Sequence, residues 1–180
     1  SPAVIEVLAD KDAKIEIYDG DKLIATGGAG EYAIPDAKLW SADSPHLYTC
    51  VSKRGGEQIE TTFGIRKIEW GAETGLLVNG QEILLRGGCI HHDNGILGAC
   101  GFADAEERRV RILKENGFNA LRIAHNPASR ALLDACDRLG MFVMDETFDG
   151  WYIPKDYHDY SRDFFEGYKS DLRSMVEKDY

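Results

Sequence analysis

The sequence of 180 residues lacks several features that would each place it in a class of proteins. No apolar run approaches the roughly 20 residues that a helix needs to cross a bilayer. No basic segment followed by an apolar stretch opens the chain, so no secretory leader is visible, although Ser1 need not be the natural first residue. The chain has four cysteines and none of them stands in a C-x-x-C pair, which disfavours a zinc ribbon and a thioredoxin-like site.

Positive charge is also scarce, with 21 Lys and Arg against 31 Asp and Glu and a formal net charge of -10. Phosphate backbones and anionic membranes attract surfaces that are rich in Lys and Arg. We therefore expect neither nucleic acid nor a membrane as a partner, whereas a neutral ligand such as a sugar is compatible with this charge.

Two of the cysteines, Cys89 and Cys136, lie within apolar patterns and are expected to be buried free thiols. Free thiols favour a reducing compartment slightly. The sequence predicts a soluble protein and leaves both the cytoplasm and the periplasm open.

The pattern of the chain changes near Trp70. Before it, segments such as KIEIYDGDKLIA, HLYTCVS and IETTFGI are short and strand-like, and Gly55-Gly56 is a turn signal between two of them. Residues 1–69 are therefore expected to form part of an immunoglobulin-like β-sandwich. About four or five strands are visible, against roughly seven in a complete domain, so the sandwich is expected to be cut at its amino end.

Residues 70–180 alternate between apolar segments and helical patterns. A hairpin of GLLV and QEILL comes first, because the Asn79-Gly80 dipeptide between them suits two turn positions with positive φ. ILLRGGCI, NALRIA and MFVMDE then indicate three strands, each followed by a helix, which is typical of a parallel sheet. Three such units cannot close a (β/α)8 barrel, so we expect the chain to be a piece of a longer protein.

Local signals predict where the helices begin and end. Asp104 is expected to cap the first helix, and Gly117 to end it. Asn126-Pro127 is expected to open the second helix, and Gly140 to end it. The third helix carries an apolar stripe at helical spacing, formed by Phe165, Tyr168, Leu172 and Val176.

Each of the three predicted strands ends in polar residues. The runs are His91-His92-Asp93, Arg122 to Asn126 with His125, and Asp145-Glu146. Because the carboxyl ends of parallel strands gather at one rim of a sheet, these runs predict one polar pocket.

The histidines of these runs have three interpretations. His91, His92 and His125 could ligate a metal, but adjacent residues of an extended strand point to opposite faces and chelate one ion poorly. Imidazole and carboxylate groups could instead hydrogen-bond a hydroxylated ligand, since together they donate and accept. The third interpretation is a pair of surface histidines near a turn.

The remaining polar residues also have structural alternatives. Arg122 inside a strand needs an acidic partner, which Asp145 or Glu146 can supply, and the pair either orients a carboxylate for function or is a plain sheet ion pair. The other carboxylate then caps a loop, and Asn126 equally suits a helix cap. Trp151 follows the third run with other aromatic residues, whose flat faces stack on sugar rings or cover the rim as core.

The motifs of these strands, taken in order, resemble glycoside hydrolase family 2, the family of β-galactosidases, β-glucuronidases and β-mannosidases. They are FGIRKIEW, LLVNGQEILLRGGCIHHDNGILGA, NALRIAHNPASRALLDACDRLG and MFVMDETFD. The earlier LWSADSPHLYTC is similar to the immunoglobulin-like domain that precedes the barrel in that family. The similarity runs from about Trp40 to the end, and the HHDNGILGA form is most similar to bacterial β-galactosidase-like members.

The resemblance implies a partial immunoglobulin-like sandwich followed by the first three βα units of a (β/α)8 TIM barrel. It also implies retaining hydrolysis of a β-glycoside by two carboxylic acids about 5–5.5 Å apart. In the family both are glutamates on later strands, the first in an Asn-Glu pair that is absent here, so no catalytic residue is expected in this chain and both are expected beyond Tyr180. The implied substrate-binding residues are His91, Asp93, Arg122, His125, Asn126, Asp145, Glu146 and Trp151.

The sequence thus predicts a fragment of a retaining β-glycosidase, most similar to a β-galactosidase, that is inactive alone. The alternatives are β-glucuronidase or β-mannosidase specificity, a non-catalytic carbohydrate-binding protein on the same scaffold, and a metal-dependent hydrolase. No cofactor or metal is expected, because TFDGW lacks the Glu-x-His of magnesium-binding β-galactosidases. The expected partners are a carbohydrate and the rest of the parent polypeptide, and a homo-oligomer stays open.

Overall fold

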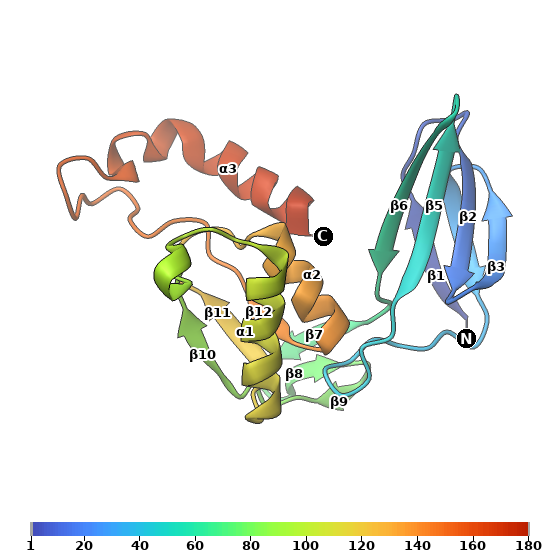
Figure 1. Cartoon of the computed structure of the whole chain (residues 1–180), viewed down its shortest axis with the longest axis horizontal. Coiled ribbons are helices and arrows are strands. Elements are labelled where there is room, and N and C mark those ends of the chain that lie inside the picture. Colours follow the sequence, from blue (N-terminus) through green and yellow to red (C-terminus); the bar gives the residue numbers. More distant parts are fainter. Residues whose placement is uncertain (1, 180) are drawn as a thin grey trace. The chain divides into compact units, whose positions relative to one another are not determined.

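The computed structural model describes residues 2–179, which form two compact units, one ending at Leu84 and the other beginning at Leu85 (Figure 1). We call them the sandwich unit and the barrel unit. The sequence predicts a boundary at residue 70, which lies inside the first strand of a small antiparallel sheet, Ile68–Gly71, that groups with the sandwich unit. Among the residues described, no helix combines the length and the apolar character needed to span a membrane.

The sandwich unit contains two antiparallel sheets whose inner faces share one core. The larger has the order β3-β2-β5-β6 and the smaller pairs β1 with β4. Their bounds are β1 Ala3–Val7, β2 Lys14–Asp19, β3 Lys22–Gly27, β4 Gly30–Ile34, β5 Tyr48–Arg54 and β6 Glu57–Phe63. Ile15 and Ile17 of β2 alternate inward and pack with Ile34 of β4 and Tyr48 of β5. The four or five strands that the sequence predicts do not include β4, a short strand that follows a glycine-rich turn.

A third antiparallel sheet of the sandwich unit has the order β7-β8-β9, with bounds β7 Ile68–Gly71, β8 Gly75–Val78 and β9 Gln81–Glu82. The predicted turn between β8 and β9 is confirmed, since Asn79 and Gly80 have φ of 54° and 78°. Such a turn suits the right-handed twist of the strands that it joins.

The barrel unit contains three parallel strands in the order β10-β11-β12, each followed by a helix, as the sequence predicts. The strands are β10 Gly87–Ile90, β11 Ala120–Ile123 and β12 Phe142–Met144. The helices are α1 Ala103–Glu115, α2 Arg130–Leu139 and α3 Phe164–Asp179, with short 3-10 turns at Gly95–Leu97 and Tyr160–Arg162.

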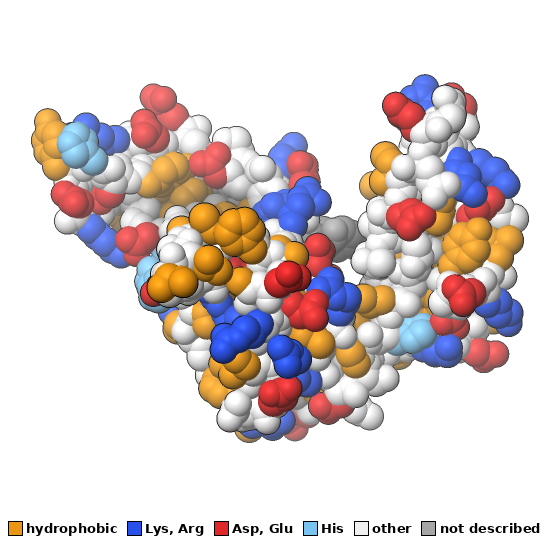
Figure 2. Space-filling view, viewed as in Figure 1, with side chains coloured by type: hydrophobic (Ala, Val, Ile, Leu, Met, Phe, Trp, Pro, Cys, Tyr) orange, Lys and Arg blue, Asp and Glu red, His pale blue; other side chains and the backbone are white. Residues whose placement is uncertain are grey.

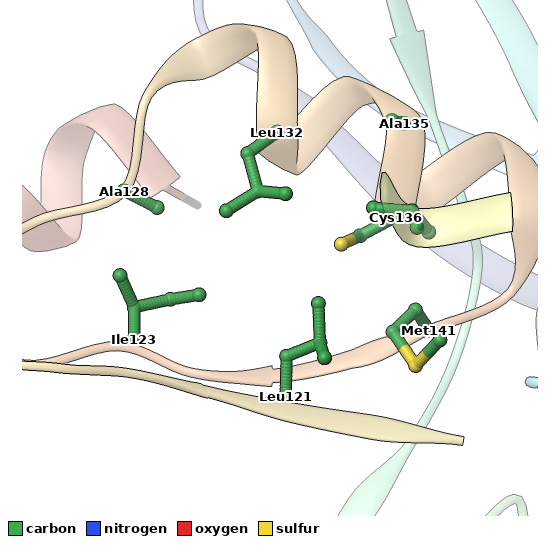
Figure 3. Packing of buried hydrophobic residues seen from close by; sticks show 8 residues of the cluster. Leu121, Ile123, Ala128, Leu132, Ala135, Cys136 and Met141 are labelled. Carbon is green, nitrogen blue, oxygen red and sulfur yellow. The ribbon is translucent and has the colours of Figure 1, made fainter. Parts of the chain in front are cut away.

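The core of the barrel unit lies between the sheet and the helices (Figure 3). Leu121 and Ile123 of β11 face Leu132 and Cys136 of α2, and all four are almost fully buried. Cys136 is therefore the buried thiol that the sequence predicts, and burial raises its pKa to about 12. This layer fixes β11 against α2, so the residues that alternate with Leu121 and Ile123 emerge on the other face.

Cys89 is exposed, so the prediction that it is buried was wrong. It pairs in register with Arg122, which alternates with Leu121 and Ile123 along β11. Both side chains consequently lie on the face of the sheet that turns away from α2. An apolar sequence neighbourhood could not reveal this, because it does not say which face of the strand each residue occupies.

Two predicted helix starts were wrong. α1 begins at Ala103 after Phe102, and Asp104 lies within its first turn. α2 begins at Arg130, where the Ser129 hydroxyl accepts the N–H of Leu132 at 3.2 Å. Serine is as good an N-cap as asparagine, and it lies closer to the first apolar residue of the helix.

The predicted helix ends are confirmed, since Gly117 and Gly140 follow α1 and α2 with φ of 84° and 75°. On α3, Phe165, Leu172 and Val176 of the apolar stripe are exposed within the part of the chain that the structure describes. On the face seen in Figure 2, acidic and basic side chains are interspersed, so this face has no continuous basic surface.

Gly87 is required where β10 approaches β11. A Cβ atom at Gly87 would lie 2.3 Å from the carbonyl oxygen of Ala120, inside any real contact distance, whereas a Cβ at Gly88 would meet its nearest atom, in Phe118, at 3.5 Å. We expect Gly87→Ala to push the strands apart and lower the free energy of unfolding by about 1–3 kcal/mol, in the range of overpacked cores.

Urea denaturation of the two single variants measures this effect. Gly88→Ala is the matched control, because it makes the same substitution one residue away without the backbone clash. Equal stability of the two variants would show that the β10–β11 spacing does not depend on Gly87.

Candidate functional site

The centre of the candidate site is the carboxylate of Glu146, which follows β12. It accepts hydrogen bonds from the guanidinium of Arg122 on β11 and from Nδ1 of His125, the latter at 2.8 Å. The ring of His91, which follows β10, lies edge-to-face with the ring of His125, with centroids 5.4 Å apart. The structure thus brings residues from three successive strand ends into one cluster, which we call the rim cluster.

The rim cluster determines the charge of Glu146. The hydrogen bond from His125, followed by that from Arg122, lowers the pKa of this carboxyl below its ordinary value. Glu146 is therefore ionised at neutral pH and accepts hydrogen bonds without donating them. A group in this state does not supply a proton to a leaving group.

Asp145 lies apart from the rim cluster, although it is the neighbour of Glu146. Its carboxylate accepts the N–H of Ala128 at 3.0 Å and contacts Asp179 at the end of α3. The sequence alone leaves open which carboxylate pairs with Arg122 and which one caps a loop. The structure gives the pairing to Glu146 and the capping to Asp145, because adjacent residues point to opposite sides of the chain.

His92 also points away from the rim cluster, and its Nε2 lies 3.0 Å from the carbonyl oxygen of Pro127. It does not converge with His91 and His125, so the geometry gives no support to a three-histidine metal site. Among the described residues, no group of three or more His, Cys, Asp or Glu side chains is arranged to hold a metal ion.

An open cavity of about 710 Å³ adjoins the rim cluster. Arg122, His125 and Glu146 form its polar wall, and Phe164 and Tyr168 of α3 contribute to its aromatic wall. Such a combination of a few convergent polar groups with aromatic rings is typical of ligand sites.

Trp151 is the most exposed aromatic side chain of this cavity, at 63% of its full exposure. Its ring lies parallel to that of Phe164 at 6.2 Å, and Phe164 in turn lies parallel to Tyr168 at 5.1 Å. Trp151 is among the predicted site residues, whereas Phe164 is not, and Tyr168 is predicted only as part of a helical stripe. Their spacing of four residues on one helix face was the available signal.

The other predicted site residues line neighbouring cavities. Asp93 lies with His91 in a cavity of about 680 Å³, and its Oδ1 accepts the N–H of Gly95 at 3.0 Å. Asn126 is exposed beside a cavity of about 500 Å³ and precedes the start of α2 without being its cap.

Two family models match the chain. Residues 3–66 match the model described as glycosyl hydrolases family 2, and residues 72–157 match its TIM barrel domain. The chain belongs to glycosyl hydrolase family 2. The predicted fold class, a partial sandwich followed by the beginning of a TIM barrel, is confirmed.

Curated relatives in this family carry two different activities in their names. The chain is 42% identical over 154 residues to the β-galactosidase BoGH2A of Bacteroides ovatus, which covers 83% of this chain and 18% of the relative. It is 32% identical over 179 residues to a putative β-glucuronidase of Formosa agariphila, covering 96% of this chain and 17% of the relative. The chain therefore spans less than a fifth of the length of these relatives.

Solved structures agree with the fold. A family 2 member from Bacteroides cellulosilyticus matches with a TM-score of 0.83 and 42% identity over 93% of this chain and 24% of that one. β-Glucuronidase 3 of Bacteroides uniformis matches with a TM-score of 0.78 and 25% identity, over 93% of this chain and 22% of its own.

The position of Asp145 has a consequence for stability. Burial, together with the hydrogen bond that the protonated carboxyl donates to Asp179, raises the pKa of Asp145 to about 6. A raised carboxyl pKa means that the folded state binds the proton more tightly than the unfolded state. The resulting stabilisation is complete below about pH 4 and is lost as the pH rises through about 6. We expect Asp145→Asn, which cannot ionise, to lose this part of the pH dependence.

Urea denaturation of both proteins between about pH 4 and pH 7 measures it, because the wild type should lose stability relative to the variant as the pH rises. Asp134→Asn, at an exposed position of α2, is the control and should leave the pH dependence unchanged. A constant difference between wild type and Asp145→Asn across this range would contradict the assignment.

Proposed function

We propose that these residues form the sugar-binding wall of a retaining β-glycosidase, with a terminal β-galactoside as the substrate. The observation that carries the proposal is the rim cluster, which places two imidazoles, a guanidinium and a carboxylate at the strand ends of a family 2 barrel. In TIM barrels this end of the strands holds the active site.

Glu146 fixes the hydrogen-bonding pattern of His125. Because the carboxylate accepts from Nδ1, the neutral ring carries its proton there, and its Nε2 can accept a hydrogen bond. Oδ1 of Asp149 lies 4.0 Å from this Nε2, beyond hydrogen-bond distance. A sugar hydroxyl in the cavity donates to this nitrogen and accepts from other donors in the wall. Arg122 holds Glu146 from the opposite side, so His125 keeps one orientation.

The cations of the cavity favour a neutral sugar. Two cationic side chains line it, Arg122 and Lys155, and each is paired with a carboxylate, Arg122 with Glu146 and Lys155 with Asp149 at 2.8 Å. A glucuronide brings a carboxylate that needs a cation of its own. Within the described residues this cavity offers it no unpaired one, which supports a galactoside over a glucuronide.

The proton donor and the nucleophile are assigned to other parts of the parent polypeptide. Retaining glycosidases use two carboxyl groups about 5–5.5 Å apart, one of them protonated before reaction. Glu146 is ionised and accepts hydrogen bonds from Arg122 and His125. Asp145 has a raised pKa, but it is bonded to the backbone of Ala128 and lies apart from the rim cluster. Neither carboxylate suits these tasks, so the 180 residues are proposed to bind sugar without cleaving it.

Hydrolysis of chromogenic substrates tests this proposal. The parent polypeptide is expected to hydrolyse a nitrophenyl β-galactoside with kcat/KM at least about 10-fold above that for the β-glucuronide, since an unpaired charge would have to be buried with the latter. The 180-residue chain is expected to hydrolyse neither. Turnover by the short chain would refute the assignment of the glutamates, and a preference for the glucuronide would refute the galactoside.

The role of Glu146 is tested by Glu146→Gln in the parent polypeptide. The amide keeps the shape but loses the charge that holds Arg122 and His125, so kcat/KM for the galactoside is expected to fall by about 10-fold or more. Glu107→Gln removes a carboxylate that pairs with Arg138 on the helices and is the matched control. Equal activity of the two variants would mean that Glu146 only stabilises the sheet.

A further inference from the structure

The loop that follows β10 and carries His91 is hydrogen-bonded to the side chain of Arg109 on α1. Arg109 donates from Nη1 to the carbonyl oxygen of His91 at 3.2 Å and from Nη2 to that of Asp93 at 2.7 Å. Its Nη2 also donates to Oδ1 of Asn94. One guanidinium thus contacts three of the four residues between positions 91 and 94.

The side chain of Arg109 is largely buried, although the loop residues whose carbonyl oxygens it contacts are exposed. The side chain of Arg109 is 16% exposed and that of Glu106, one turn earlier on α1, is 7% exposed. Asn94 donates to Oε1 of Glu106 at 3.0 Å, while Oε2 lies 3.7 Å from Nε of Arg109 and makes no hydrogen bond within the described residues. The guanidinium of Arg109 therefore compensates the negative charge of the buried Glu106 carboxylate. This attraction keeps the guanidinium against the loop.

Only arginine can make this set of contacts. Its planar guanidinium presents five N–H groups in a fixed fork, whereas lysine is a point charge with three rotatable donors. A lysine at position 109 can neutralise Glu106 but cannot reach the two carbonyl oxygens and Asn94 together. The substitution Arg109→Lys therefore keeps the ion pair with Glu106, which supports the fold, and removes the hydrogen bonds that hold the loop.

We propose that Arg109 is a positioning residue that sets His91 against His125 and thereby determines the affinity of the site for its sugar. The proposal rests on the proposed function. Arg109 touches the backbone of His91 and leaves its ring free, so it acts through the placement of the loop. One other bond ties the loop to α1, that from Asn94 to Oε1 of Glu106, and this carboxylate lies beside Arg109. The bond from the N–H of Asn94 to the carbonyl of Gly98 at 2.8 Å is internal to the loop.

Arg109→Lys in the parent polypeptide tests this inference, with Arg111→Lys as the matched control at an exposed position two residues further along α1. We expect Arg109→Lys to raise KM for the nitrophenyl β-galactoside about 10-fold while kcat changes less than about 3-fold, because a misplaced binding group weakens ground-state and transition-state binding alike. The melting temperature is expected to stay within a few degrees of the wild type, since the ion pair with Glu106 persists.

Hydrogen exchange of the parent polypeptide gives a readout that does not need activity. Amides of residues 91–98 are expected to exchange about 10-fold faster in Arg109→Lys, with those of β11 and α2 unchanged, because only local opening becomes easier. If Arg109→Lys fails to fold, the double variant Glu106→Gln and Arg109→Gln removes both charges together. Its KM and the exchange of its loop amides are then measured instead.

The outcomes are distinct. Unchanged exchange in the loop overturns the inference, and so does faster exchange with KM within about 2-fold of the wild type, the range of a neutral change. A wild-type polypeptide that hydrolyses no β-glycoside refutes the proposed function instead. In that case, faster exchange in Arg109→Lys that is confined to residues 91–98 still supports the conclusion that Arg109 fixes the loop to α1.

Discussion

The ion pair between Arg122 and Glu146 depends on the alternation of side chains along β11, and the rest of the site depends on that pair. Leu121 and Ile123 pack in the core against α2, so the side chain of Arg122 lies on the opposite face of the sheet. There it meets the carboxylate that follows the neighbouring strand. A guanidinium in this position fixes Glu146, and Glu146 in turn fixes the orientation of His125.

The position of this network explains how one short sheet can present the proposed ligand-binding wall. Each of the three strands contributes its polar residues just where its pairing ends, so side chains that are far apart in the sequence become neighbours. The helices and Gly87 keep the strands at the spacing that this requires. In the proposed function, sugar binding is a property of the first strands of the barrel, whereas bond cleavage needs carboxyl groups from elsewhere in the polypeptide.

The sequence allowed the order of the elements in the barrel unit, the turn at Asn79-Gly80 and the gathering of residues from the three polar runs to be predicted, because each follows from a local pattern and from the geometry of parallel sheets. It could not divide the tasks between Asp145 and Glu146, since adjacent residues differ only in the side of the chain to which they point.

The roles of Cys89 and Arg109 were equally hidden from sequence reasoning. Cys89 lies among apolar residues in the sequence, but its side chain is on the exposed face of the sheet. Arg109 is one of several arginines on a charged helix. Only the register of β10 with β11, and the approach of α1 to the loop after β10, reveal their places. Both depend on contacts between segments, which a single sequence does not encode in any local pattern.

The most direct test is a crystal structure of the parent polypeptide with galactose bound. The account predicts sugar hydroxyls within about 2.7–3.2 Å of ring nitrogens of both His91 and His125, with Glu146 bonded to Arg122 and remote from the anomeric carbon. A sugar bound away from these two rings, or a Glu146 carboxylate against the anomeric carbon, would contradict it.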